Sequence, residues 1–503
     1  MHLVRVVSDF GAALSSHLDL VSSTVAGEFV GDFGDERLNR RCRTVAVDRA
    51  SAPGDSDSAA ARGDAARQGA YHFMNHPNVT SEAILEAHRP ATVARCAAAS
   101  RVLVIGDTTE CPFVRRKATE GLGALNIPKA PGLYMHATYA VTPEGVPLGV
   151  LDAFFIARDP ETLGRGNSKE KHSTPPEERE SVKWRRSLDA TERLCAELPP
   201  DADVTVIFDR EGANSDVLER ATKEDAPYRL IVRARNERRV ADTPKGENVH
   251  DGLLRMAPAE TYDFVVPARQ GRKARPAVLE LRYAVTELVG VRHRRPGVSG
   301  KSPSTVVTTI IAKEVQAPPD VPKEERLDWR LFTTREVKTT ADARRCVDDY
   351  AKRWSVEVLF KTFKSVQSAL KRQYRTAKAL KASMAMDLVL SFLHLRVAAR
   401  SREEPEAPAT EIFSREECSA LWRFRGRPVP AAPKLKEAAR EVALLGGYRG
   451  RRSDKSPGPL CFARGMAKLA VIVATIRTIE GRPADPRVDE ASSLAADVDI
   501  DDD

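Results

Sequence analysis

The chain has few cysteines, and none of them lies in a pattern that binds metal or forms a disulfide framework. Its seven cysteines are scattered over 503 residues, with no CxxC pair and no His-rich partner segment. This argues against a zinc module and against a secreted disulfide-linked fold, and it fits a reducing cytosol. We find no apolar run near the ~18 to 20 residues that cross a bilayer, and no signal peptide. The sequence therefore predicts a soluble intracellular protein of several folding units.

Acidic residues are concentrated in the C-terminal tail, which masks how basic the rest of the chain is. Residues 485–503 hold eight acidic residues against one base, Arg487, a net charge of −7, so the rest of the chain carries +15 against +8 for the whole. A body this basic suggests a polyanionic partner, with nucleic acid as the first candidate. The abundance of Ala and Arg also fits a coding sequence rich in G and C. Charge alone leaves both interpretations open.

Strand and helix patterns alternate along the middle of the chain, which indicates an α/β layer. Residues 1–75 read as helical, with a loop at 51–63, and residues 383–479 read as helical again. Residues 236–326 change to short β-like runs and basic turns, which predicts a β-rich insertion. The expected strands are residues 101–107, 204–209, 228–235 and 329–334, with a hairpin at 133–157, a helix at 183–198 and one long helix at 341–377.

Two acids, Asp107 and Asp209, each end an apolar segment that predicts a buried strand. Either acid alone more often caps a turn or a helix. The long helix that follows adds the string Tyr350-x2-Arg353-x3-Glu357-x6-Lys364. On an ideal helix these four side chains fall within about 60° of one another. A solvated charged face is the simpler alternative, but the mixed chemistry beside an apolar stripe favours a site.

Three converging carboxylates, Asp107, Asp209 and Glu357, repel one another unless cations lie between them. Divalent ions with oxygen ligands, usually Mg²⁺, suit such a site. Two such ions support in-line phosphoryl displacement. Arg353 and Lys364 would then bind phosphates, Arg through its planar fork and Lys as a point charge.

The string in the long helix resembles the signature of the DDE transposases of the insertion-sequence-four family. Residues 34–37, 68–79, 106–109, 208–211 and 327–334 are also similar to the family, and the resemblance runs with gaps from about residue 31 to about residue 465. It implies a metal-binding triad of Asp107, Asp209 and Glu357 that holds two Mg²⁺ ions, for which Mn²⁺ would substitute. The dipeptide Lys183-Trp184 also resembles the family, and we assign it no role.

The resemblance also implies DNA contacts. Tyr350, Arg353 and Lys364 would hold the phosphate of the strand that is not transferred, and Trp329 would stack on a flipped base. Arg233 and Arg235 would face DNA, and Arg37 and Arg41 would contact the transposon end. Each has a simpler alternative: a core aromatic for the tryptophan, an ordinary half-exposed strand for the first arginine pair, and a solvated helix face for the second.

We therefore expect an α/β fold with a ribonuclease-H-like core, residues 76–375, interrupted by the β-rich insertion. A helical DNA-end-binding region (1–75), a helical dimerisation region (376–481) and an acidic disordered tail (482–503) would flank it. The resemblance implies cut-and-paste transposition: nicking, hairpin formation, hairpin opening and transfer of the 3′-OH end into target DNA. The partners would be terminal inverted repeats, target DNA and a second copy of the chain, in a bacterial cytoplasm.

Two other functions remain open. A metal-dependent nuclease could use the same acids without strand transfer, although it would need neither the Tyr-Arg-Lys edge nor a stacking tryptophan. A domesticated DNA-binding derivative would not cut at all, although the presence of all three acids argues against it.

Overall fold

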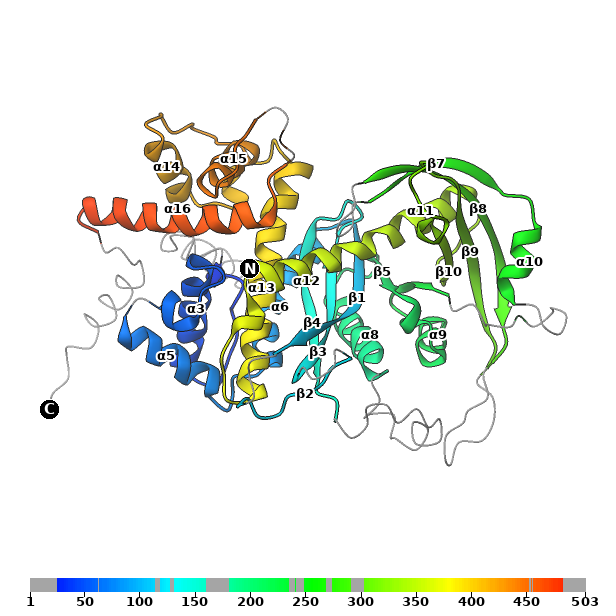
Figure 1. Ribbon diagram of the computed structural model, residues 1–503, viewed down its shortest axis with the longest axis horizontal. Coiled ribbons are helices and arrows are strands. Elements are labelled where there is room, and N and C mark those ends of the chain that lie inside the picture. Colours follow the sequence, from blue (N-terminus) through cyan, green and yellow to red (C-terminus); the bar gives the residue numbers. More distant parts are fainter. Residues whose placement is uncertain are drawn as a thin grey trace, which may run out of the picture. The chain divides into compact units, whose positions relative to one another are not determined.

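The computed structural model (Figure 1) describes residues 25–61, 63–113, 118–126, 131–159, 181–234, 240, 248–267, 274–290, 303–451, 454 and 456–482. They fold into two compact units. The sheet unit contains the described residues of Thr92–Lys117 and Leu122–Val358. The helical unit contains those of Met1–Ala91, Ala118–Gly121 and Leu359–Asp503. The chain passes between the two units several times, so neither is a single stretch of sequence.

The sheet unit is built on one mixed sheet of ten strands. The strands follow the order β2-β3-β1-β5-β6-β10-β9-β8-β7, and β4 pairs with β3. Strand β1 is parallel to β5, and β5 to β6, whereas the other pairs are antiparallel. The strands are β1 (Arg101–Pro112), β2 (Gly123–Ala124), β3 (Pro131–Val141), β4 (Pro147–Ile156), β5 (Asp203–Phe208), β6 (Arg229–Arg233), β7 (Glu260–Val266), β8 (Arg275–Leu288), β9 (Thr305–Gln316) and β10 (Asp328–Thr333).

Helices and short turns connect these strands. They are α8 (Val182–Cys195), η3 (Arg210–Gly212), α9 (Ser215–Ala221), α10 (Val249–Arg255), η4 (Lys323–Glu325), α11 (Thr340–Ala351), η5 (Lys352–Trp354) and the start of α12 (Ser355–Ser365). Helix α8 packs against β1, β3, β4 and β5. The strands, hairpin and helix predicted before residue 235 are confirmed at their described residues. The described part of the insertion is β-rich, and its strands extend the same sheet.

The long helix expected at residues 341–377 is wrong. It ends at Ala351, continues through the 3₁₀ turn η5, and resumes as α12, which ends at Ser365. Beyond it, Ser368 has a left-handed backbone with a φ of 50°, which a helix cannot contain. Side chains on either side of η5 therefore do not share the narrow face of one ideal helix.

The helical unit is organised around α13 (Ala377–Glu403), most of which is buried. The helices before it are α3 (Glu36–Ser51), α4 (Asp57–Ala60), α5 (Asp64–Asn75) and α6 (Ser81–Ala97), whose last residues enter the sheet unit. Around α13 lie η6 (Ala369–Lys371), η7 (Ala409–Glu411), α14 (Arg415–Phe424), α15 (Leu435–Leu445) and α16 (Pro459–Ile479). The loop expected at residues 51–63 contains α4, because Ser56 caps this single turn through its hydroxyl.

A buried ionic network joins the N-terminal helices to α13. The Arg49 guanidinium donates to Asp57 at 2.7 Å and to Asp387 at 3.3 Å, and the latter carboxylate is fully buried. Arg372 donates to both oxygens of Asp387, at 2.8 and 2.7 Å. Because a buried charge without a partner is costly, removing one member would destabilise the unit strongly.

Two described helices, α13 and α16, are long and apolar enough to cross a membrane by length and composition alone. Within the apolar window of α13, 94% is buried inside the protein, against 33% for α16. Burial in the core of the unit accounts for the apolar sequence of α13. The apolar face of α16 is left partly exposed.

Candidate functional site

Asp107 and Asp209 come next along the chain after the last residue pair of the parallel β1–β5 ladder, Asp107 within β1 and Asp209 directly after β5. Gly106 of β1 is paired with Phe208 of β5, so the next residues along the two strands are Asp107 and Asp209. A side chain at Gly106 would meet the Phe208 ring at 2.6 Å, which explains glycine at this position. The predicted strand end is confirmed for Asp209, whereas Asp107 lies inside β1, which extends to Pro112 because it stays paired with β3 beyond the end of β5.

Arg353 and Glu357 complete this group. They lie in η5 and α12, in the last part of the sequence that belongs to the sheet unit. Arg353 donates to Asp107 Oδ2 at 2.6 Å and to Glu357 Oε1 at 3.0 Å. The Arg353 side chain is 16% exposed, and that of Glu357 is 48% exposed. The guanidinium therefore bridges an acid on β1 and an acid in the first turn of α12.

The electrostatics of Asp107 show that the three acids act on one another. Burial raises the pKa of Asp107 to about 6, against the lowering effect of Arg353, and the charges of Asp209 and Glu357 raise it further. Its Oδ1 accepts the backbone N–H of Thr108 at 2.7 Å. Within the described residues, however, no three His, Cys, Asp or Glu side chains are close enough together to hold a metal ion.

Tyr350 and Trp329 belong to a buried aromatic cluster. Trp329 is 3% exposed, and its ring packs edge-on against Tyr350, Trp354 and Phe264, with ring centroids 5.2 to 5.7 Å apart. Its burial fits the simpler alternative of a core aromatic. Trp354, which the sequence analysis passed over, is partly exposed and directly follows Arg353.

Arg233 lies in the same electrostatic neighbourhood. Its guanidinium donates to the backbone oxygen of Asp328 at 3.2 Å. Burial lowers its pKa, and the positive charges of Arg210 and Arg353 lower it further, whereas Tyr350 acts in the opposite direction. Arg235 lies outside the described residues. Of the two strand arginines, the structure thus places Arg233 in the neighbourhood of Arg353 and Tyr350.

The remaining predicted residues belong to the helical unit. Lys364 is half-buried on α12, seven residues beyond Glu357. Arg37 is exposed on α3, and Arg41 of the same helix is partly buried. A side chain at Gly69 of α5 would meet the Arg41 guanidinium at 2.2 Å, so this glycine lets the arginine lie against α5.

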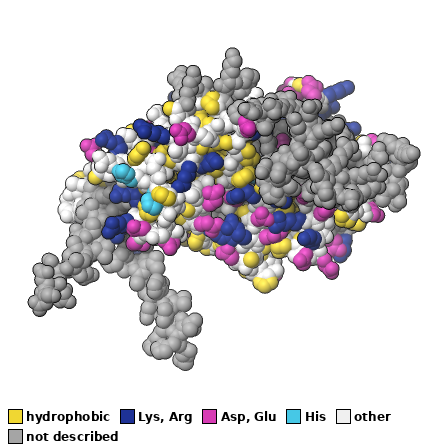
Figure 2. All heavy atoms as spheres, turned by 90° about the horizontal axis from the view of Figure 1, so that it is seen from below, with side chains coloured by type: hydrophobic (Ala, Val, Ile, Leu, Met, Phe, Trp, Pro, Cys, Tyr) yellow, Lys and Arg dark blue, Asp and Glu magenta, His cyan; other side chains and the backbone are white. Residues whose placement is uncertain are grey.

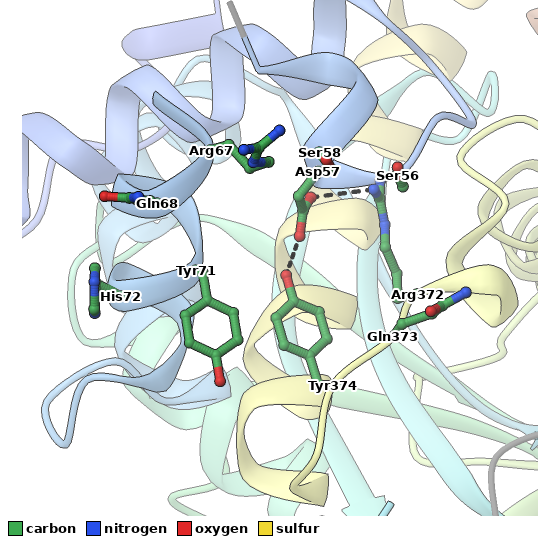
Figure 3. Close-up of a pocket in the computed structure, with 10 residues that line it drawn as sticks. All are labelled: Ser56, Asp57, Ser58, Arg67, Gln68, Tyr71, His72, Arg372, Gln373 and Tyr374. Carbon is green, nitrogen blue, oxygen red and sulfur yellow. Dashed lines mark hydrogen bonds and ion pairs between the residues drawn. The ribbon is translucent and has the colours of Figure 1, made fainter. Parts of the chain in front are cut away.

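A cavity of about 490 Å³ lies in the helical unit between α4, α5 and residues 372–374 (Figure 3). Asp57 and Arg372 of the ionic network line it, and Asp57 accepts hydrogen bonds there from Arg372 and from the Tyr374 hydroxyl. From α5 the exposed side chains that line it are Arg67, Gln68, Tyr71 and His72. One face of α5 is thus polar and open to solvent.

Charge does not mark out a binding surface on the face shown in Figure 2. Over the described residues of that face, Lys and Arg side chains are interspersed with Asp and Glu side chains. The basic excess of the sequence is therefore not gathered into one uniform patch there.

Comparison with known proteins identifies one segment of the helical unit. Residues 27–79, which include α3, α4 and α5, match the transposase DNA-binding family. A piggyBac transposase, solved by cryo-EM as a synaptic complex with hairpin DNA, matches 89% of this chain and 74% of its own at 10% identity and a TM-score of 0.32. A likeness at that level carries neither function nor mechanism. The family match supports a DNA transposase whose partner is DNA.

Proposed function

We propose that this protein is a cut-and-paste DNA transposase of the DDE type. The observation that carries the proposal is the grouping of Asp107, Asp209 and Glu357 around Arg353, in a chain whose residues 27–79 match a transposase DNA-binding family. Membership of the insertion-sequence-four family, with likeness to the Tn-five transposase, is part of the proposal and rests on the sequence resemblance.

The sheet unit supports a ribonuclease-H-like core. Its strands β4, β3, β1, β5 and β6 lie in that spatial order, with β1 antiparallel to β3 and parallel to β5. Parallel strands present the side chains at their carboxyl ends to one edge, where ligands of open α/β sheets commonly bind. Asp107 of β1 and Asp209 after β5 lie where the parallel pairing of these strands ends, and α12 supplies the third acid.

The three carboxylates suit divalent cations in their chemistry. Oxygen ligands of this kind are preferred by Mg²⁺, with Mn²⁺ as a substitute, and the raised pKa of Asp107 reflects burial together with acids that repel one another. Arg353 now supplies the neutralising positive charge, so it would have to leave two of the acids for cations to bind. Two bound ions would supply activation of the attacking oxygen and stabilisation of the leaving oxygen in phosphoryl transfer.

Arg353 is then free to bind a phosphate of the strand that is not transferred. Its planar guanidinium matches phosphate geometry as well as it matches carboxylate geometry. We assign Lys364, Tyr350 and Arg233 to the same strand, and a partly exposed Trp354 is better placed than a buried Trp329 to stack on a base flipped out at the hairpin. Such stacking contributes ~1 to 3 kcal/mol per base.

Recognition of the terminal inverted repeats falls to α3 and α5. The family match covers both helices, and α5 presents Arg67, Gln68, Tyr71 and His72 to solvent. Arg and Gln side chains read guanine and adenine edges, and both also bind phosphates. Arg37 of α3 adds an exposed positive charge. We place the protein in the bacterial cytoplasm, where it would meet its DNA.

A homodimer would hold two transposon ends at once, since a two-fold interface coordinates both cuts. The exposed apolar side chains of α16, such as Val471 and Ile479 at 64% and 78% exposed, are the proposed contact.

The test is cleavage of terminal-repeat DNA in Mg²⁺. Asp107→Ala, Asp209→Ala and Glu357→Ala should each abolish nicking and leave DNA binding largely intact, because basic contacts dominate affinity. Substantial cleavage by Glu357→Ala would remove α12 from the site. Nicking without strand transfer by the unaltered protein would favour the nuclease, and binding without nicking would favour a non-cutting derivative.

A further inference from the structure

Lys183 has a buried ammonium group that the proposed mechanism does not use. Its side chain is 7% exposed in the first turn of α8, and its Nζ donates to Glu211 Oε2 at 2.8 Å. Burying a lysine is costly unless its charge is paired. The Glu211 side chain, by contrast, is 63% exposed, so the ion pair joins a buried ammonium group to a carboxylate at the surface.

Glu211 in turn holds Asp209. The 3₁₀ turn η3 begins after Asp209, whose Oδ1 accepts the backbone N–H of Glu211 at 2.9 Å. This bond fixes one carboxylate oxygen of Asp209 at the start of the turn. A turn of three residues is short, and its side-chain tether to α8 at Lys183 restrains it from outside.

The same helix also supports the other acid, Asp107. One turn after Lys183, Ser187 Oγ bonds to His136 Nε2 at 3.0 Å, and His136 Nδ1 bonds to the Thr108 hydroxyl at 2.8 Å. The backbone N–H of Thr108 donates to Asp107 at 2.7 Å. Trp184 lies between the two contacts, packed against His136 and Phe208. Helix α8 therefore supports the segments that carry both acids.

We propose that Lys183 is a positioning residue for Asp209, acting through Glu211. The ion pair holds η3, whose backbone N–H at Glu211 binds one oxygen of Asp209 and so fixes this carboxylate beside Asp107, on whose pKa its charge acts. This inference rests on the proposed function, because the position of Asp209 matters only if it binds a cation with its neighbours. It gives a role to a lysine that contacts no reacting group.

The experiment measures Mn²⁺ affinity by calorimetry on the full chain without DNA, alongside thermal unfolding and nicking of terminal-repeat DNA. Lys183→Met and Glu211→Ala should each weaken Mn²⁺ binding on the order of tenfold, and the double variant should lose no more than either single one, because both remove one interaction. Lys183→Arg should restore most of the affinity. Lys338→Met, which removes an exposed pair with Glu336 at 2.6 Å, is the matched control and should change nothing.

The sign of the Lys183→Met effect separates the alternatives. If Glu211 were itself a cation ligand, removing the competing ammonium would tighten Mn²⁺ binding, and that result would overturn the proposal. Should Lys183→Met fail to fold, Glu211→Ala tests the pair from its exposed side, and unaltered Mn²⁺ affinity there would also overturn it. Absence of nicking and Mn²⁺ binding in the unaltered protein would instead refute the proposed function.

Discussion

Arg353 reaches across 246 positions of sequence to Asp107, donating to its Oδ2 at 2.6 Å. The same guanidinium donates to Glu357, so one cation neutralises two of the three acids proposed to bind metal. An arginine in this position competes with divalent cations for the same oxygens. The proposed function therefore requires an exchange, in which Arg353 releases the acids and binds a phosphate.

Removing that arginine should strengthen metal binding in the absence of DNA. We expect Arg353→Met to bind Mn²⁺ on the order of tenfold more tightly, since a hydrogen bond to a charged group contributes about 1.5 kcal/mol or more. Calorimetric titration with Mn²⁺ measures this directly. Arg344→Met, which breaks a 3.2 Å pair with Glu260, is the control and should leave the affinity unchanged. Weaker binding by Arg353→Met would show that the arginine organises the acids instead.

The basic residues should matter more for hairpin formation than for the first nick. Arg353→Ala and Lys364→Ala should slow hairpin formation about tenfold or more, because each removes a charge-assisted contact to the strand that forms the hairpin. Denaturing gels with end-labelled DNA separate the two steps. Lys361→Ala, an exposed lysine on the same helix, should affect neither. Equal loss of both steps would indicate a general role in organising the site.

The two tryptophans should respond differently to substitution. Trp329→Ala should destabilise the sheet unit by about 3 to 5 kcal/mol, because it empties a packed aromatic site. Trp354→Ala should destabilise the unit less, because its ring is partly exposed and loses one edge-on contact with Trp329, but it should abolish the fluorescence change of a 2-aminopurine placed at the flipped position. A full fluorescence change in Trp354→Ala would show that Trp354 does not stack on the flipped base and would leave Trp329 as the candidate.

Glu417 should make the stability of α14 depend on pH. Burial raises its pKa from 4.5 to about 7, so the folded state favours the protonated acid. The contribution of Glu417 to the free energy of unfolding is therefore fully present below about pH 4.5 and is lost as the pH rises through 7. Glu417→Gln keeps an acceptor for the Ser414 N–H, which the acid binds at 2.8 Å. It should be on the order of 3 kcal/mol more stable than the unaltered protein at pH 8 and equal at pH 4.

Amide hydrogen exchange in α14, compared between the two proteins at each pH, measures this difference. A constant difference from pH 4 to pH 8 would show that Glu417 does not titrate in this range.

Pairing of two DNA ends should depend on the exposed face of α16. Val471→Asp and Ile479→Asp should prevent the mixed complex that forms when long and short terminal-repeat duplexes are combined, and binding of one duplex should persist. Val429→Asp, at another exposed apolar residue of the helical unit, is the control. Removing the whole region after residue 375 is not informative, because it deletes Asp387 from the buried network. A normal mixed complex on native gels in both variants would place the dimer contact elsewhere.

Local patterns were enough to pick out both acids but not to end both strands. An apolar run followed by an acid marks the end of β5 before Asp209, whereas β1 continues past Asp107 to Pro112 because it pairs with β3; the parallel pairing of β1 with β5 then brings the two acids together. The break in the long helix was not predictable in this way, because residues 352–354 are Lys, Arg and Trp and contain no proline or glycine that would mark it. The mixed helix face derived for an unbroken helix was therefore only an approximation.

The sequence also did not predict which charged and aromatic side chains are buried. Nothing near Trp329 in sequence indicates that three other aromatic rings enclose it. The Lys183 partner lies 28 residues away and is an ordinary exposed glutamate by pattern. Arg49 lies in the segment predicted to be helical, but nothing in that segment indicates that its side chain is buried against Asp387, 338 positions later. Such pairs follow from the three-dimensional fold and from no local signal.

The Arg49–Asp387 contact also has a consequence for synthesis of the chain. When α3 and α4 leave the ribosome, Arg49 can reach Asp57 but the second carboxylate has not been made. At ~5 to 20 residues per second, the ~330 residues between them take about 16 to 66 s to translate. During that time the segment matched to the DNA-binding family lacks the helix around which it packs. In a nascent chain this segment can therefore complete its packing only after α13 has been made, which is later than Asp107, Asp209 and Glu357.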